Sequence, residues 1–263
     1  MSSISKILIP FDFTEPAISA LEYGLQFVGY ERPIAIEALY VSKVPTAPQD
    51  VKEIKEDFAK LLGSMKIKPK IAPTIVIGQG ALVPTILEER KAQNIELILM
   101  GTLGDISADE HVTNASKLVL QADCPVITVP YGAKLQVPKK IALVLGKEEI
   151  EHPKLLGLLL HIARSFNAKV HVLTIYKDSI YDEKVVVESN EETLEYYLEH
   201  FYAEHNFEQN DDIEEGILQY IKDKKIDLLA ILPRNHADRS SPSEGRLTKI
   251  LTLHATVPVL TLD

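Results

Sequence analysis

The residues best suited to binding chemistry lie near position 100, where an apolar run ends in Gly-Thr-Leu-Gly, from Gly101 to Gly104. Thr113 and Asn114 follow at the start of a predicted helix. Glycines let backbone N–H groups approach an anion closely, and the N-terminus of a following helix adds the positive end of its dipole. These residues suggest a phosphate site, but a tight strand-to-helix turn would also explain the two glycines.

A second candidate, Asp12, directly follows the apolar run 7–11. A residue in that place lies on the rim where parallel sheets bind their ligands. The helix dipole alone also favours an acid at a helix start, and Thr14 and Thr113 are of the residue type that commonly caps helices. Each of these side chains therefore has a structural explanation beside the functional one.

The sequence lacks other patterns that would indicate catalysis. Cys124 precedes a predicted buried strand and has no adjacent histidine to activate it, so we expect a core residue. His200 and His205 lack the spacing of metal ligands. There is no Walker lysine loop and no Gly-x-Ser-x-Gly sequence. We predict no catalytic residue and no metal-ligand set, with slow ATP hydrolysis as the remaining alternative.

Composition narrows the class of protein. The chain has 263 residues, 46% hydrophobic and 25% charged, with a net charge of −10. These fractions are typical of a globular protein, and the negative charge argues against non-specific binding to nucleic acid or an anionic membrane. We expect a cytoplasmic protein, because the sequence has one cysteine, no apolar run that could span a bilayer and no secretory leader.

Three apolar landmarks occur twice, in the same order and at nearly the same offset. They are residues 6–12 with 140–146, 95–100 with 226–231, and 124–129 with 257–262. Such self-similarity indicates a tandem repeat. A polar, glycine-containing connection at 131–134 separates the copies, so we predict domains at 1–134 and 135–263.

Within each half, apolar strands alternate with amphipathic helices. In the first half the strands are expected at 7–11, 34–41, 74–77, 97–100 and 126–129. They are continuous apolar runs, so both faces of the sheet must be covered. This order predicts an α/β fold with a doubly wound parallel sheet in each half, and ligands at the carboxyl ends of the strands.

Taken as a tandem pair, nearly the whole chain resembles the universal stress protein family. The resemblance rests on residues 7–14, on 100–104, on Thr113-Asn114 and on 124–126. It implies two Rossmann-like domains, of the adenine nucleotide alpha hydrolase-like kind, that pack as an internal pseudo-dimer through their last strands. It also implies a stress-response regulatory role, with a further homodimer and the identity of any protein partner left open.

In ATP-binding members the fourth strand is followed by Gly, two residues, Gly, nine residues, and Gly with Ser or Thr. The resemblance implies that Gly101 and Gly104 cradle the phosphates, with Mg²⁺, and that Thr113 supplies a hydroxyl. It places Asp12 at the adenine and ribose end, and the backbone of Val41 against the adenine.

This chain departs from that pattern in both halves. Val112 occupies the third glycine position, after a loop of seven residues, 105–111. In the second half Gly146 replaces the aspartate, residues 232–235 replace Gly-x-x-Gly, and Pro233 removes an amide donor. Two hypotheses therefore stay open: an adenine-nucleotide site in the first half only, or an adaptor that acts through protein contacts without nucleotide.

Overall fold

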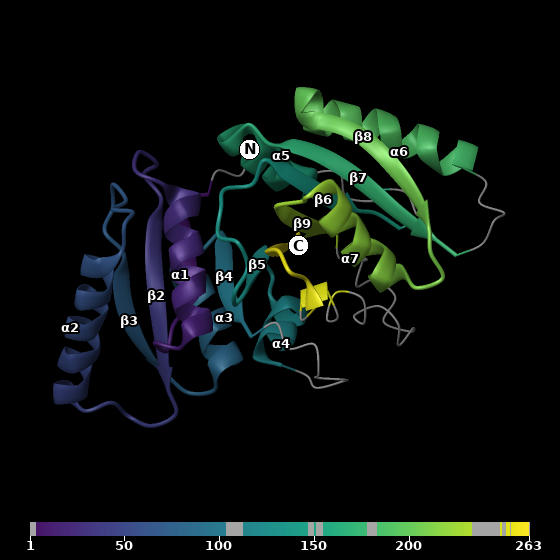
Figure 1. The fold of residues 1–263 in the computed structure, drawn as a ribbon. Coiled ribbons are helices and arrows are strands. Elements are labelled where there is room, and N and C mark those ends of the chain that lie inside the picture. Colours follow the sequence, from purple (N-terminus) through teal and green to yellow (C-terminus); the bar gives the residue numbers. More distant parts are fainter. Residues whose placement is uncertain are drawn as a thin grey trace. The chain divides into compact units, whose positions relative to one another are not determined.

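The chain folds into two compact units, Ile4–Gln136 and Val137–Asp263, in the computed structural model shown in Figure 1. The structure describes residues 4–103, 113–146, 150, 155–177, 183–232, 248, 251–252 and 254–262, without the side chains of 183–190. The connection predicted at 131–134 lies just before the division. Each unit is described by itself below, and association of the halves through their last strands stays a prediction.

The first unit is built on a parallel sheet. In the described part of this unit its strands are β1 (Lys6–Pro10), β2 (Ala35–Ser42), β3 (Thr74–Gln79), β4 (Leu97–Thr102) and β5 (Val126–Pro130). Their order is β3-β2-β1-β4-β5, and every neighbouring pair is parallel. The predicted doubly wound parallel sheet is confirmed.

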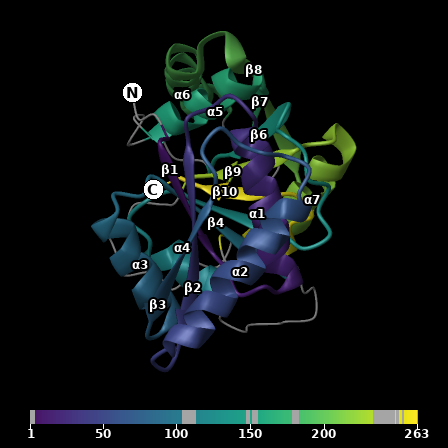
Figure 2. The same cartoon turned by 90° about the vertical axis from the view of Figure 1, so that its left-hand side faces the viewer.

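Helices cover both faces of this sheet. They are α1 (Glu15–Val28), α2 (Pro48–Ser64), α3 (Leu82–Ala92) and α4 (Asn114–Gln121). Gly24 of α1 sits against the side chains of Ile9 and Leu99, whereas Leu8 and Ile98 belong to the core beneath α3 and α4. Neighbouring strand residues point to opposite faces, so α1 and α3 lie on opposite sides of the sheet, as Figure 2 shows.

The second unit repeats this topology. Its described strands are β6 (Lys140–Val144), β7 (Lys169–Tyr176), β8 (Tyr202–Gln209), β9 (Leu228–Ile231) and β10 (Val259–Thr261). They are parallel in the order β10-β9-β6-β7-β8, the same path as in the first unit. The helices are α5 (Leu156–Phe166), α6 (Glu183–Leu198) and α7 (Ile213–Lys224).

Two strands of the first unit run further than the sequence indicated. Gly78 and Gln79 belong to β3, and the turn comes only at Gly80, where φ is 137°. Gly101 and Thr102 likewise continue β4, because they pair with Val129 and Pro130 of β5. The prediction that Gly101 follows the strand was therefore wrong: glycine in extended backbone makes ladder hydrogen bonds like any other residue.

Of the helix starts that the structure describes, those of α4 and α7 are capped by a side chain, and those of α1, α2, α3 and α5 are not. Asp212 caps α7 through hydrogen bonds from the amides of Glu214 and Glu215, at 2.9 and 3.2 Å. Cys124 is buried, as predicted for a core residue. Among the described helices, none combines the length and apolar character needed to cross a bilayer.

Candidate functional site

Three of the predicted site residues lie where neighbouring strands of the first unit's sheet reach their carboxyl ends. Strand β1 lies between β2 and β4, and the chain passes from β1 to β2 on one side but reaches β4 on the other. Ligands of doubly wound sheets bind at such a reversal, beyond the carboxyl ends of the strands. Asp12 directly follows β1, Val41 is near the end of β2 and Gly101 is near the end of β4.

Asp12 organises the turn between β1 and α1. Its Oδ1 accepts hydrogen bonds from the Thr14 amide at 3.1 Å and the Thr14 hydroxyl at 2.6 Å. Thr14 stands at the N-cap position, but its side chain does not cap the helix. The expected Thr14 cap was therefore wrong: the hydroxyl donates to the carboxylate instead. These two bonds use Oδ1 and hold an exposed carboxylate near the positive end of the α1 dipole.

Phe13, next to Asp12, has a φ of 61°. A bulky side chain in this left-handed region costs of the order of 1 kcal/mol, and such residues concentrate at functional sites. Its ring centroid lies 4.9 Å from that of Phe11 and 6.4 Å from that of Tyr40 in β2. Phe11 is buried, whereas Phe13 and Tyr40 are only half-buried. Asp12 is thus flanked by an aromatic surface, the Phe13–Tyr40 surface.

Sequence reasoning missed the Phe13–Tyr40 surface. Phe13 and Tyr40 come from different strand ends, so their proximity depends on the parallel pairing of β1 with β2. The available signal was an aromatic residue beside each of two predicted site residues, Asp12 and Val41.

Gly101 is required by packing. A Cβ on this residue would lie 2.0 Å from the carbonyl oxygen of Pro16 and 3.0 Å from the amide nitrogen of Ala17. Only glycine lets the first turn of α1 approach β4 so closely. The glycine therefore has a full explanation in helix–strand packing, and its presence does not by itself indicate a phosphate.

Thr113 caps helix α4. Its hydroxyl oxygen accepts a hydrogen bond from the Ser116 amide at 3.2 Å, and the Ser116 hydroxyl donates to the Thr113 carbonyl at 3.0 Å. Asn114 is the exposed first residue of α4. Helix α4 leads from the end of β4 to the start of β5, so its N-terminus lies at the same edge as Asp12. Gly104 and Val112 lie outside the described residues.

The second unit provides an internal comparison. The amide of Phe11 donates to the carbonyl of Leu39 at 2.9 Å, and the amide of Leu145 donates to that of Leu173 at 3.0 Å. This match aligns Asp12 with Gly146, as the sequence repeat predicted. Strand β9 is followed by Leu232, and residues 233–247, which include Pro233 and Gly245, lie outside the described residues.

Both units have an acid at the amino ends of their strands, on the side of the sheet away from Asp12. Glu96 Oε2 accepts from the amide of Lys6 at 2.8 Å, and Asp227 Oδ2 accepts from that of Lys140 at 2.9 Å. Burial opposes ionisation of Glu96, but hydrogen bonds from Ser5 and Lys6 outweigh it and lower its pKa. These two acids are part of the fold. Because the second unit forms the same sheet with Gly146, the fold does not require an acid at Asp12.

Side chains that could hold a metal do not gather in the part of the chain that the structure describes. No group of three or more His, Cys, Asp or Glu residues lies at ligating distance there. His205 is held by Thr174 Oγ1 at 2.9 Å from its Nε2, and His171 pairs with Glu204 at 3.1 Å. These contacts link β7 to β8 and position the histidines within the second unit's sheet.

The fold defines a class: two tandem Rossmann-like α/β units, each built on a parallel sheet of the same strand order. Residues 3–130 match the model of the Universal stress protein family. Residues 3–130 therefore form a domain of the universal stress protein family. No curated protein matches the sequence.

Solved structures share the fold of both units. A universal stress protein from Archaeoglobus fulgidus DSM 4304 has a TM-score of 0.73 at 16% identity, with 98% of each chain covered. A putative universal stress protein from Pseudomonas aeruginosa UCBPP-PA14 has a TM-score of 0.66 at 14% identity, covering 99% of this chain and 93% of that one. A functionally unknown protein from Pseudomonas aeruginosa PAO1 has a TM-score of 0.63 at 14% identity, covering 99% and 92%. At these identities the likeness shows the fold alone.

Proposed function

We propose that this stress-response protein senses or regulates through an adenine nucleotide bound at the Asp12 edge of the first unit only. The observation that carries the proposal is the contrast between Asp12 and Gly146. The two units share strand order and strand-end hydrogen bonds, yet at the matched position the first unit has the carboxylate of Asp12 and the second has Gly146. The carboxylate of Asp12 is exposed where sheets of this kind bind their ligands, which supports a ligand as the reason for this acid.

The chemistry of this edge suits an adenine nucleoside. The Phe13–Tyr40 surface offers half-buried rings on which a purine can stack, worth about 1–3 kcal/mol per base. The carboxylate of Asp12 accepts hydrogen bonds from ribose hydroxyls or an exocyclic amine, and the backbone of Val41 lies one strand away. The phosphates would extend to the N-terminus of α4, at Thr113 and Asn114, where Mg²⁺ would accompany them.

A second function is favoured by two specific observations. Packing against Pro16 accounts for Gly101, and capping of α4 accounts for Thr113. Both residues are then explained without phosphate, as in an adaptor that works through protein contacts alone. For either function we propose a cytoplasmic location, on the grounds of the negative charge and the single cysteine. We assign the edge to binding and not to catalysis.

Calorimetry separates the two functions. The full chain is titrated with ATP, ADP and AMP, with and without Mg²⁺, and nucleotide carried through purification is identified by mass spectrometry. The proposal expects one adenine nucleotide per chain. No heat with any of the three and no carried nucleotide would leave the adaptor as the function.

A matched pair of variants tests the edge itself. Asp12→Asn keeps an oxygen for the bonds from Thr14 but removes the charge, so binding should weaken about tenfold, the worth of one charge-assisted hydrogen bond. Asp123→Asn makes the same change before β5, at the opposite edge, where Asp123 contacts Arg90 at 3.3 Å. It should bind nucleotide like the parent chain. Equal affinity of Asp12→Asn and the parent chain would remove Asp12 from the site.

A further inference from the structure

The first unit has an edge strand without the usual protection. Within the described residues β3 is the last strand of this sheet and pairs with β2 alone. Its sequence, Thr-Ile-Val-Ile-Gly-Gln, carries no charge and no proline, and Ile75, Val76 and Ile77 are all half-buried. Exposed edges present unpaired N–H and C=O groups, and proteins commonly block them with charges, prolines or bulges. Strand β3 has none of the three.

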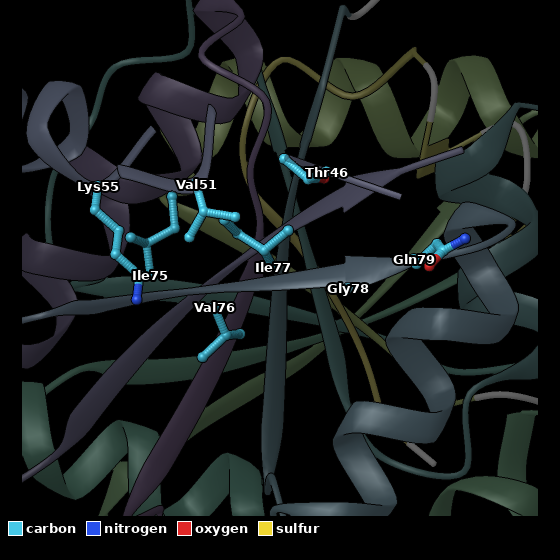
Figure 3. A pocket seen from close by; sticks show the side chains of 8 residues that line it. All are labelled: Thr46, Val51, Lys55, Ile75, Val76, Ile77, Gly78 and Gln79. Carbon is cyan, nitrogen blue, oxygen red and sulfur yellow. The ribbon is translucent and has the colours of Figure 1, made fainter. Parts of the chain in front are cut away.

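A groove runs along β3, between this strand and the first half of α2. It has a volume of about 430 Å³, within the range of pockets that hold small ligands. Its lining consists of Thr46, Val51, Lys55 and residues 75–79. In Figure 3 the side chains of Ile75 and Ile77 point towards Val51 and Lys55, and Val76 points to the other face. Aliphatic side chains thus line part of the groove, and Thr46, Gln79 and the ammonium group of Lys55 make the rest of the lining polar.

The charge around the groove is opposite to that of the chain. Residues 48–79 contain six lysines and four acidic residues, in a chain of net charge −10. Lys52 and Lys60 are paired with acids of α2, but Lys55 lines the groove. Lys66, Lys68 and Lys70 are exposed in the segment between α2 and β3, where the ammonium group of Lys68 donates to the carbonyl of Gly63 at 3.0 Å. This local excess of positive charge favours an acidic occupant.

We propose that the β3–α2 groove binds an extended acidic segment of a partner protein, which adds to the sheet as a strand beside β3. Main-chain hydrogen bonds to β3 supply affinity, and alternate side chains supply specificity, as in other strand-addition sites. One apolar side chain fits between Val51 and Ile77, and a carboxylate pairs with Lys55. Residues 75–79 accommodate about five residues of partner, or roughly 17 Å of strand.

The same edge could pair with β3 of a second copy, but charge opposes this. Two copies joined along β3 would set one lysine-bearing groove against another and would supply no carboxylate to either Lys55. Like charges brought together across an interface are destabilising. A partner with the opposite charge avoids this cost, so we assign the groove to a different protein and not to self-association.

Peptide binding to the ¹⁵N-labelled full chain tests the proposal. The probes are acetyl-Glu-Val-Thr-Ile-Glu-amide and its counterpart with lysine in place of both glutamates. The acidic peptide should shift the amide resonances of residues 74–79 and bind at least tenfold more tightly than the basic one. A copy of the acidic peptide with N-methylated alternate amides should lose at least tenfold in affinity, because it cannot complete the ladder.

Protein variants complete the test without disturbing the strand. Lys55→Glu should reverse the preference between the two peptides. Lys52→Glu, at a lysine paired with Glu56 and outside the lining, should leave the acid-over-base ratio within twofold of the parent. No binding of the acidic peptide at millimolar concentration, equal affinity for the two peptides or unchanged affinity after N-methylation would each overturn the proposal. So would a concentration-dependent dimer in sedimentation that Ile77→Lys abolishes, since the occupant would then be a second copy. Asp12→Asn should not alter peptide binding, which keeps this test separate from that of the nucleotide site.

Discussion

Replacing Gly101 with alanine tests whether packing or a phosphate explains this glycine. The added Cβ would lie 2.0 Å from the Pro16 carbonyl oxygen, whereas ordinary contact begins at 3.4 Å. The first turn of α1 would therefore have to move by about 1.4 Å from β4. Overpacking of this kind costs typically 1–3 kcal/mol and sometimes more, and here the obstacle is backbone, so we expect about 3 kcal/mol.

Gly63→Ala is the matched control. Gly63 lies in α2 of the same unit, and a Cβ there would meet nothing within 4 Å. Alanine is the better helix former, so stability should stay the same or rise by up to about 1 kcal/mol. The two substitutions add the same methyl group, and the difference between them isolates the contact with Pro16.

Urea unfolding of the full chain, followed by far-ultraviolet circular dichroism, measures both variants. Hydrogen exchange at the amides of β4 assigns any loss to the first unit. A Gly101→Ala chain that loses less than about 1 kcal/mol, with β4 protected as in the parent chain, would refute the packing argument. If the loss is found, weaker nucleotide binding by Gly101 variants cannot be used as evidence of a phosphate contact, and Asp12→Asn is the informative change.

Three further predictions follow from other contacts. Tyr40→Leu should weaken ATP and AMP binding about equally, by five- to tenfold in calorimetry, since it removes a stacking surface and no phosphate contact; a change in the ATP-to-AMP ratio would contradict this. Burial lowers the pKa of His205 to about 4, from an ordinary value of 6.5, so the unfolded chain binds the extra proton first. Burial of the neutral His205 ring therefore lowers the free energy of unfolding as the pH falls from 6.5 towards 4, by about 1–2 kcal/mol after discounting for solvent. The urea midpoints of the parent chain and of His205→Gln should converge at low pH. Midpoints that change with pH in parallel would contradict this prediction. Glu96→Ala and Asp227→Ala should each lower the free energy of unfolding by about 1–2 kcal/mol at pH 7, because each acid accepts hydrogen bonds from equivalent backbone amides. The pKa of Glu96 is lowered in the folded chain, so its contribution to stability is lost as the pH falls below about 4.5. Urea unfolding at pH 7 and pH 3 checks this, and a loss of stability from only one of the two variants would contradict the equivalence of the two acids.

Much of the fold could be predicted from residue order because the determining interactions are local or repeated. Continuous apolar strands that alternate with amphipathic helices leave few arrangements other than a covered parallel sheet. The doubled landmarks required the two halves to share a topology, which the strand orders confirm. Strand ends were less predictable: β4 continues through Gly101 because of its pairing with Val129, which is distant in sequence.

The candidate site was predicted in part. Asp12 was assigned to the rim because it follows the first strand, Val41 was assigned to the site by the family resemblance, and the structure places both at the carboxyl ends of neighbouring strands. The Phe13–Tyr40 surface was missed because it depends on a positive φ at Phe13 and on the register of β1 against β2, neither of which sequence spacing reveals. The caps show the same limit, since Thr14 and Thr113 have the same residue type and only Thr113 caps its helix.

By itself, the sequence determined that the chain is a tandem α/β protein with an acid after its first strand and none at the matching place in the second half. Only the tertiary structure decided why residue 101 is a glycine. A missing Cβ serves equally to admit a phosphate or to admit a helix, and both demands select glycine. The choice depends on which atoms lie above the residue, and these are the backbone atoms of Pro16. The ligand hypothesis therefore now depends on Asp12 and its aromatic neighbours, where the fold leaves the residue type free.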